Sequence, residues 1–286
     1  RWNRALHTGK VVSATPYAVG LAIRVAFVLI KQSRLTLTTG DAYWYHMQAK
    51  LVAEGKGFLN PFLYYKHGIV GEGGDHPHGF TLILTVLDLL GIDSAQGQRL
   101  VMCLLGTVSV LLVALLARRL AGDAAGVVAA VLAAIYPNMW INDGMLMVET
   151  VYIAAIAMSL LATYRYLDRA SLGSLSLLSI SLTVGAMTRP EAAALFVFMV
   201  TPLVLSRRTL DWRRRFGHLA LAAVFPIVAF APWIGYNLVR FEEPVVISTG
   251  AGQTLAAGNC DVTYSGWALG YYDLRCLEEP EIEVPT

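Results

Sequence analysis

The stretch VVSATPYAVGLAIRVAFVLI, residues 11–30, decides the fold class of this chain. A helix of about 20 apolar residues crosses the roughly 30 Å of hydrocarbon in a bilayer. The whole chain is 56% hydrophobic and 15% charged, whereas a soluble domain carries about 25% charged residues. The sequence therefore predicts an all-α polytopic membrane protein.

Apolar windows in the rest of the chain predict further membrane-spanning helices, which give a bundle of about seven spans. We expect these helices at residues 99–117, 124–140, 147–166, 175–187, 192–205 and 219–237. The apolar stretch from Phe80 to Leu90 has only about 11 residues, a length that suits an interfacial or re-entrant helix better than a span.

The positions of the basic residues orient the bundle, because cytoplasmic loops carry an excess of lysine and arginine. Arg1, Arg4 and Lys10 place the N-terminus in the cytoplasm, and the cluster from Arg207 to Arg215 then falls on the same side. This cluster is interpreted as a topological anchor, and no nucleic-acid partner is expected. The first span is too long for the core of a cleavable signal and is interpreted as a signal anchor.

This topology divides the chain into a membrane module, residues 1–239, and an extracytoplasmic tail, residues 240–286. The first outer loop, residues 34–97, contains a predicted helix from Tyr43 to Glu54 that two glycines end. Cys260 and Cys276 in the tail can form a disulfide outside the cytoplasm, or they are two unrelated thiols.

Arg24 is a charged residue inside the first span. A charged side chain facing lipid is costly, so we expect Arg24 to face the bundle or a polar cavity.

The motif GDAYWY, residues 40–45, places Asp41 just beyond the first span, and carboxylates near hydrocarbon usually mark a site. Under the predicted topology, many polar residues share this outer face. They are Asp41, Lys66, His67, Glu72, Asp75, His76, His78, Glu149, Arg189, Glu191 and Arg240. No nucleotide donor is expected there and the sequence has no glycine-rich phosphate loop, so a group donor would be lipid-linked.

Transfer from a lipid-linked donor requires a carboxylate base, cations for the leaving phosphate and an apolar groove for the lipid. Asp41 suits the first role, and the apolar bundle suits the third. The cations for the leaving phosphate could be Arg189, Lys66, the histidines and Arg240.

Each candidate also has a purely structural interpretation. Asp41 can cap the helix that follows it, a role compatible with catalysis. The Asp75-His76-Pro77-His78 motif is a polar turn, a contact for phosphate or acceptor, or a set of metal ligands. Lys66 and His67 are phosphate contacts or loop surface. A divalent ion, Mg or Mn, remains possible, and its candidate ligands are Asp41, Asp75, His76 and Glu149.

Glu149 lies at the start of a predicted span, where its charge either favours the helix dipole or acts as a second carboxylate that orients the acceptor or a metal. Arg189 lies in Thr188-Arg189-Pro190-Glu191, which ends one helix and starts another. Arg189 pairs with Glu149 or Glu191, or it binds an anionic lipid head.

The order of these motifs resembles the bacterial family-39 glycosyltransferases of the GT-C fold, relatives of the protein O-mannosyltransferases and the lipid A aminoarabinose transferase. The matching features are Gly-Asp-aromatic in the first loop, then Asp75-His76-Pro77, Tyr136-Pro137 with Glu149, Thr188-Arg189-Pro190-Glu191, and Pro232-Trp233 with Asn237. The tail, with Cys260 and Cys276, looks like an actinobacterial branch.

The resemblance implies a polyprenyl-phosphate sugar donor, an outward-facing site, inversion at the anomeric carbon and Asp41 as the base. Its glycan, lipid or protein acceptor would also lie outside the cytoplasm. The chain departs from the family pattern at His78, where the family has a second proline, and at Tyr236, where it often has an arginine that Arg240 would replace. The rival interpretations are a non-catalytic lipid carrier or flippase, and a scaffold subunit of a cell-envelope assembly.

Overall fold

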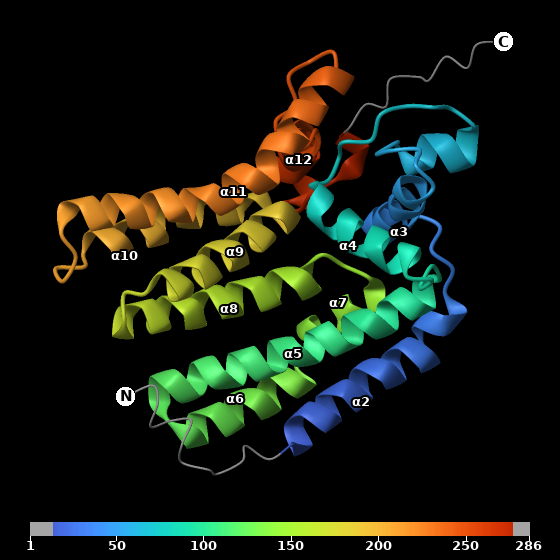
Figure 1. The fold of residues 1–286 in the computed structure, drawn as a ribbon. Helices are drawn as coiled ribbons and strands as arrows, with labels where there is room; N and C mark the ends of the chain where they lie inside the picture. The colour runs from blue at the N-terminus through green and yellow to red at the C-terminus, as the bar shows by residue number, and fades with distance from the viewer. Residues whose placement is uncertain (1–13, 277–286) are drawn as a thin grey trace.

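Long apolar helices lie side by side and form most of the protein (Figure 1). The computed structural model describes residues 14–276, and within this range the chain forms helices and no β-strand beyond a single bridge between Leu59 and Glu72. The predicted all-α polytopic membrane class is confirmed.

In the described part of the chain, three helices are long and apolar enough to cross a membrane: α5 (Ala95–Ala121), α8 (Glu149–Asp168) and α11 (Trp212–Arg240). A fourth candidate is the pair α6 (Asp123–Ile135) and α7 (Pro137–Met145), whose axes are bent by 47°. The span predicted at 124–140 corresponds to this bent pair, and the helix breaks at Tyr136 because Pro137 lacks a backbone donor and disfavours helical geometry at the residue before it.

The remaining apolar segments are shorter. Helix α2 (Thr15–Ile30) has 16 residues and α9 (Leu172–Thr188) has 17. The predicted span at 192–205 lies in a shorter apolar helical segment, Pro190–Leu205, which consists of a 3-10 helix η3 (Pro190–Ala193), a π-helix η4 (Phe196–Val200) and an α-helix α10 (Thr201–Leu205). The first residues of the span predicted at 11–30 lie outside the described part of the chain.

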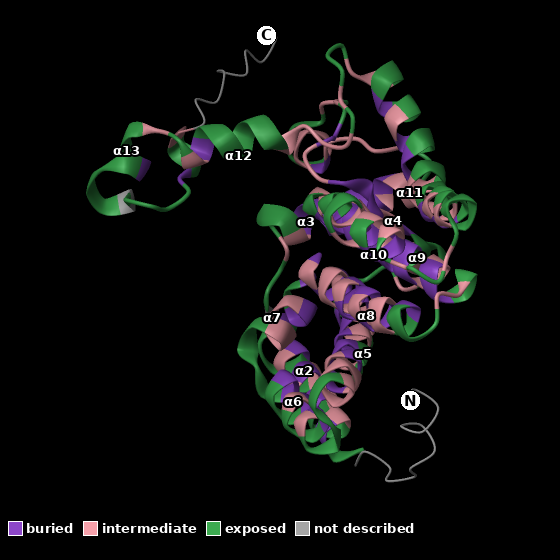
Figure 2. Ribbon diagram, turned by 90° about the vertical axis from the view of Figure 1, so that its left-hand side faces the viewer, coloured by how far each residue is buried: buried purple, intermediate pink, exposed green. Residues whose placement is uncertain are grey.

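The helices pack along shared seams of small and branched side chains. Helix α8 packs along α5 and α9, and α5 also packs along α6 and α2. Large hydrophobic side chains such as Phe198 and Val239 remain exposed on the outside of the bundle, whereas the buried residues line the sides where helices meet (Figure 2). This distribution is expected when lipid covers the outer surface.

One ion pair is buried in the interior of the bundle. Arg24 Nε of α2 donates to Asp143 Oδ2 of α7 at 2.7 Å, and their side chains are 0% and 1% exposed. Gly106 of α5 leaves the space for this carboxylate, since a Cβ at that position would overlap it. Arg24 therefore faces the bundle, as predicted.

Two helices of the first loop cover one end of the bundle, α3 (Gly40–Ala53) and α4 (His78–Leu89). Trp44, Tyr45, Phe80 and Leu84 form a buried cluster between them. At 12 residues, α4 is too short to span a bilayer. The loop is thus a folded part of the module.

Polar side chains tie these two helices to α5. His46 of α3 bonds through Nδ1 to Gln98 Oε1 of α5 at 2.8 Å, and Gln98 Nε2 donates to Asp88 Oδ1 of α4 at 2.6 Å. These contacts fix α3 and α4 on the bundle.

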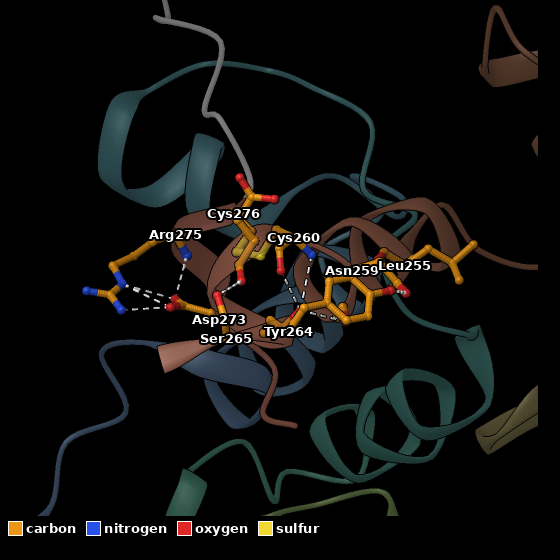
Figure 3. The surroundings of a disulfide bond; sticks show 11 residues. Leu255, Asn259, Cys260, Tyr264, Ser265, Asp273, Arg275 and Cys276 are labelled. Carbon is orange, nitrogen blue, oxygen red and sulfur yellow. Dashed lines mark hydrogen bonds and ion pairs between the residues drawn. A yellow bond between two sulfur atoms is a disulfide. The ribbon is translucent and has the colours of Figure 1, made fainter. Parts of the chain in front are cut away.

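The chain ends in short helices that project beyond the bundle, α12 (Gly250–Gly258) and α13 (Asp261–Tyr264), followed by η5 (Gly266–Ala268) and η6 (Leu274–Cys276) (Figure 2). Cys260 and Cys276 are joined by a disulfide with a Cα–Cα distance of 6.1 Å. Figure 3 shows the nearby ion pair, in which Arg275 Nη2 donates to Asp273 Oδ2 at 2.7 Å.

Candidate active site

Asp41 lies in the first turn of α3, where its negative charge is stabilised by the helix dipole. Thr39 occupies the N-cap position, and no side chain makes a capping hydrogen bond there. The predicted capping role therefore does not explain this aspartate. Its side chain is 51% exposed and accessible to a substrate.

His76 is the neighbour of Asp41 in space. Its Nε2 lies 3.6 Å from Asp41 Oδ1, within ion-pair range and too far for a hydrogen bond. The ring packs against Trp44 and Tyr45, with centroids 5.6 and 4.9 Å away. Burial lowers the pKa of His76, while Asp41 and Asp75 oppose this shift, so the neutral imidazole is favoured near pH 7.

Asp75 connects the first loop to the tail. Thr249 Oγ1 donates to Asp75 Oδ1 at 3.1 Å, and the Thr249 backbone N–H donates to Gly74 O at 2.7 Å. Burial raises the pKa of Asp75, although the Thr249 hydrogen bond opposes it. A residue from far along the chain thus orients the carboxylate of Asp75.

An ion pair joins the start of α8 to the end of α9. Arg189 Nη2 donates to Glu149 Oε1, and Arg189 Nη1 lies 4.0 Å from Glu191 Oε1. Within residues 14–276, the buried Glu149 Oε2 has no hydrogen-bond partner. Arg189 keeps a partly exposed guanidinium, so it can reach an anionic ligand.

The charges of Asp41, Glu149 and Arg189 all affect the pKa of Tyr45. Burial is the largest cause of its raised pKa, followed by the negative charges of Asp41 and Glu149, and Arg189 opposes the shift. Asp41, Glu149 and Arg189 therefore all act electrostatically on Tyr45, and Asp41 and Arg189 also act on His76. We name these five residues the acid–arginine cluster.

Lys66 and His67 lie at the end of η2 (Leu63–His67), and both are exposed. Lys66 Nζ is 5.4 Å from the Tyr43 ring centroid and 4.9 Å from that of Phe62, an arrangement that favours a cation over the aromatic faces. The lysine is thereby held near the start of α3.

Arg240 is largely engaged in holding the first loop. Its Nη1 donates to Phe58 O at 2.8 Å and to Glu72 Oε2 at 3.0 Å, and its Nη2 donates to Gly73 O at 3.1 Å. The side chain is 6% exposed. These contacts fit a structural role better than the predicted phosphate contact.

His78 lies apart from the acid–arginine cluster. It is 3% exposed and stacks on Trp233, with ring centroids 4.2 Å apart. Burial lowers the pKa of His78 to about 4. Its ring lines an apolar cavity of about 380 Å³, together with Gly57, Phe58, Leu82, Met187, Ala229, Pro232, Trp233 and Tyr236.

The four predicted metal ligands do not form a metal-binding group. Across the described residues, no three histidine, cysteine or acidic side chains converge as metal ligands. Asp75 Oδ1 accepts from Thr249, and Glu149 Oε1 accepts from Arg189. The residues therefore do not fit a metal centre, and no step below involves one.

Gln48 is a structural residue of the site that the sequence analysis missed. Its Nε2 donates to Leu59 O at 3.2 Å and to Gly73 O at 3.4 Å, and Thr81 Oγ1 donates to its Oε1 at 3.1 Å. It holds the loop that carries the His76 motif. In the sequence, Gln48 is a polar residue within an aromatic-rich predicted helix, and this feature could have indicated a buried hydrogen-bonding role.

These observations define a helical membrane protein that carries an acid–arginine cluster and an apolar cavity. Residues 75–236 match the model of the dolichyl-phosphate-mannose-protein mannosyltransferase family. The match covers more than half of the chain, which therefore belongs to this family of GT-C-type membrane glycosyltransferases. None of the curated proteins compared with the chain matches it significantly. The match begins at Asp75 and does not include Asp41.

Proposed function

We propose that this protein transfers a sugar from a polyprenyl-phosphate donor to an acceptor hydroxyl on the extracytoplasmic face, with inversion and with Asp41 as general base. The observation that carries the proposal is the acid–arginine cluster. A half-exposed carboxylate and a partly exposed guanidinium both act electrostatically on Tyr45 and on His76.

In the proposed step, an acceptor hydroxyl binds at Asp41 and gives its proton to the carboxylate. The acceptor oxygen forms a bond to the anomeric carbon as the bond from that carbon to the phosphate oxygen breaks. The polyprenyl phosphate leaves with the electron pair of the broken bond. A single displacement from the opposite face inverts the anomeric centre.

Arg189 is proposed to hold the leaving phosphate, with Lys66 and His67 approaching from η2. Guanidinium groups bind phosphate by two parallel hydrogen bonds, and their charge stabilises the developing anion. His76 and Asp75 would contact the sugar or the acceptor, and Glu149 keeps Arg189 oriented. The geometry gives less support to a phosphate contact by Arg240.

The cavity lined by His78 is proposed to bind the polyprenyl end of the donor. Its lining is apolar, and the neutral, buried imidazole suits an uncharged contact better than a phosphate. His78 would then contribute shape at the lipid end of the site.

We also propose the orientation that the basic residues predict, with a cytoplasmic N-terminus and with the site and tail outside. The disulfide between Cys260 and Cys276 supports this orientation, because such bonds persist in oxidising compartments. The division into a membrane module, residues 1–239, and a tail, residues 240–286, is part of the same proposal.

The test uses the purified protein in detergent with a radiolabelled mannosyl polyprenyl phosphate and a soluble acceptor. Transfer requires label on the acceptor together with an equal amount of unglycosylated polyprenyl phosphate, and NMR of the product gives the anomeric configuration. A lipid carrier or a scaffold would leave the donor intact in detergent, a result that would reject the proposed reaction.

A further inference from the structure

A buried polar chain connects four helices close to the acid–arginine cluster. Arg24 of α2 donates through Nε to Asp143 Oδ2 of α7 at 2.7 Å. The other carboxylate oxygen, Oδ1, accepts from Thr150 Oγ1 of α8 at 2.7 Å. Arg24 also donates from Nη1 to Gly20 O at 3.0 Å and to Ala134 O of α6 at 3.4 Å.

All three side chains are removed from solvent, with Arg24 at 0%, Asp143 at 1% and Thr150 at 1% exposure. Burying an ion pair is expensive, and well-packed apolar residues often give equal or greater stability. Ionisable residues within a membrane bundle are therefore candidates for a functional role. Stability alone is a weak explanation for this polar chain.

Two glycines allow the helices to approach the polar chain closely. A Cβ at Gly106 of α5 would overlap the Asp143 carboxylate, and a Cβ at Gly144 would lie 2.5 Å from the Phe27 ring of α2. The surrounding helices are thus shaped around this carboxylate, which sits at a defined position.

The turn that follows Asp143 leads directly into the proposed site. Leu146 is fully buried in the left-handed conformation, with φ of 62°, which is unfavourable for a residue other than glycine. The next residues start α8, where Glu149 is the first residue and Thr150 the second. Packing must therefore hold this turn in place.

Successive residues of a helix point about 100° apart. Thr150 uses this geometry to bond to Asp143 of α7, while Glu149 bonds to Arg189 at the end of α9. The first turn of α8 is thereby held from two directions. Loss of the bond between Thr150 and Asp143 removes one of these two constraints, so Glu149 holds the Arg189 guanidinium less firmly.

We infer that Asp143 and Thr150, held by Arg24, are positioning residues for Arg189 and act through Glu149. The inference rests on the proposed function to the extent that Arg189 meets the donor phosphate. None of the three residues touches the substrate in this scheme. They keep the guanidinium in one orientation before the donor binds, so their loss raises the donor KM more than it lowers kcat.

The experiment compares Thr150→Val, which keeps the side-chain shape and removes the hydroxyl that donates to Asp143, with Thr150→Ser, which keeps a hydroxyl at this position. Thr163→Val is the matched control, because Thr163 lies on the same helix and its hydroxyl bonds to Ser159 O within that helix, at 2.9 Å. The first readout is the rate at which phenylglyoxal modifies Arg189, measured by peptide mass spectrometry on the folded, detergent-solubilised protein. Glu149→Gln serves as the reference for a released Arg189.

We expect Thr150→Val to raise the Arg189 modification rate several-fold, toward the rate of Glu149→Gln, and Thr150→Ser and Thr163→Val to match the unmodified sequence. Equal rates in Thr150→Val and Thr163→Val would overturn the inference. Thr150→Ala, which also removes the hydroxyl that donates to Asp143, gives the same comparison if Thr150→Val does not fold.

The second readout is a double-mutant cycle on the donor KM. If Thr150 acts through Glu149, adding Thr150→Val to Glu149→Gln changes KM little further, whereas an independent structural effect multiplies the two changes. The labelling readout requires no turnover. If labelling responds as expected and no sugar is transferred by the unmodified protein, the positioning role stands and the proposed function fails.

Discussion

His76 Nε2 lies 3.6 Å from Asp41 Oδ1, so the two polar motifs of the first loop meet at one point. The contact is possible because α3 and α4 pack on each other through Trp44, Tyr45 and Phe80. The aromatic residues of the GDAYWY motif thus have a packing role, since they bring the histidine to the aspartate.

Asp41→Asn is expected to lower sugar transfer by about 10²- to 10⁴-fold, the usual contribution of a general base. The amide has nearly the same size and cannot accept the acceptor proton. Turnover of the labelled donor is the measurement, and donor binding and the thermal unfolding midpoint should not change. Asp93→Asn is the matched control, since Asp93 is exposed beyond α4. Unaltered turnover in Asp41→Asn would remove the base assignment.

Arg189→Gln is expected to raise the donor KM by about ten- to a hundredfold. A hydrogen bond to a charged group contributes about 1.5–3 kcal/mol, and each 1.4 kcal/mol is about tenfold in affinity. Initial rates over a range of donor concentrations test this expectation. Arg208→Gln, at an exposed position in the predicted cytoplasmic cluster, should have no effect. An unchanged KM in Arg189→Gln would show that another cation binds the phosphate.

The buried His78 predicts acid sensitivity. Its pKa falls from 6.5 to about 4 on folding, so below pH 6.5 the unfolded chain takes up a proton that the folded protein does not bind. The free energy of unfolding is therefore not reduced by His78 above pH 6.5, and it decreases as the pH falls from 6.5 to about 4. At pH 5 the loss is about 2 kcal/mol, at roughly 1.36 kcal/mol per pKa unit.

His78→Phe tests this prediction, because phenylalanine keeps the stacking on Trp233 and cannot bind a proton. Thermal unfolding midpoints at pH 7.5 and pH 5 should differ less in this variant than in the unmodified protein. His67→Phe, at an exposed position outside the cavity, should keep the original difference. Equal differences in all three proteins would contradict the buried, neutral assignment.

Replacing Cys260 and Cys276 by serine is expected to loosen the tail and leave the bundle intact. A disulfide closing a loop of about this length stabilises the folded form by about 3 kcal/mol, by restricting the unfolded chain. Limited proteolysis should then cut within α12 and α13 faster, by at least tenfold. Similar cleavage rates with and without the disulfide would show that α12 and α13 are held by other contacts.

The sequence was sufficient to predict the apolar helices, the folded first loop and the inward position of Arg24, because hydropathy and length act locally. The bend at Tyr136 was missed, although the proline that causes it is visible in the sequence. The change from 3-10 to π to α helix within residues 190–205 was also missed, because apolar composition does not determine the hydrogen-bond pattern of a helix.

The partners within the site depend on tertiary packing and could not be read from spacing. Asp143 looks like a residue of an outer loop in the sequence, and only the bend before α7 brings it to Arg24. The sequence position of Arg240 predicted a phosphate ligand. In the structure, most of its N–H groups donate to residues of the first loop instead.

Thr249 bridges back to Gly74 and Asp75, and Gly250 lies so close to Asp75 O that no side chain fits between them. The homologous region ends at Tyr236, before the arginine and threonine that clamp the loop bearing His76. A polypeptide that ended at Tyr236 would contain the homologous region and lack Arg240 and Thr249, which hold the loop bearing His76. Expression trials for a minimal catalytic fragment should therefore extend past Gly250.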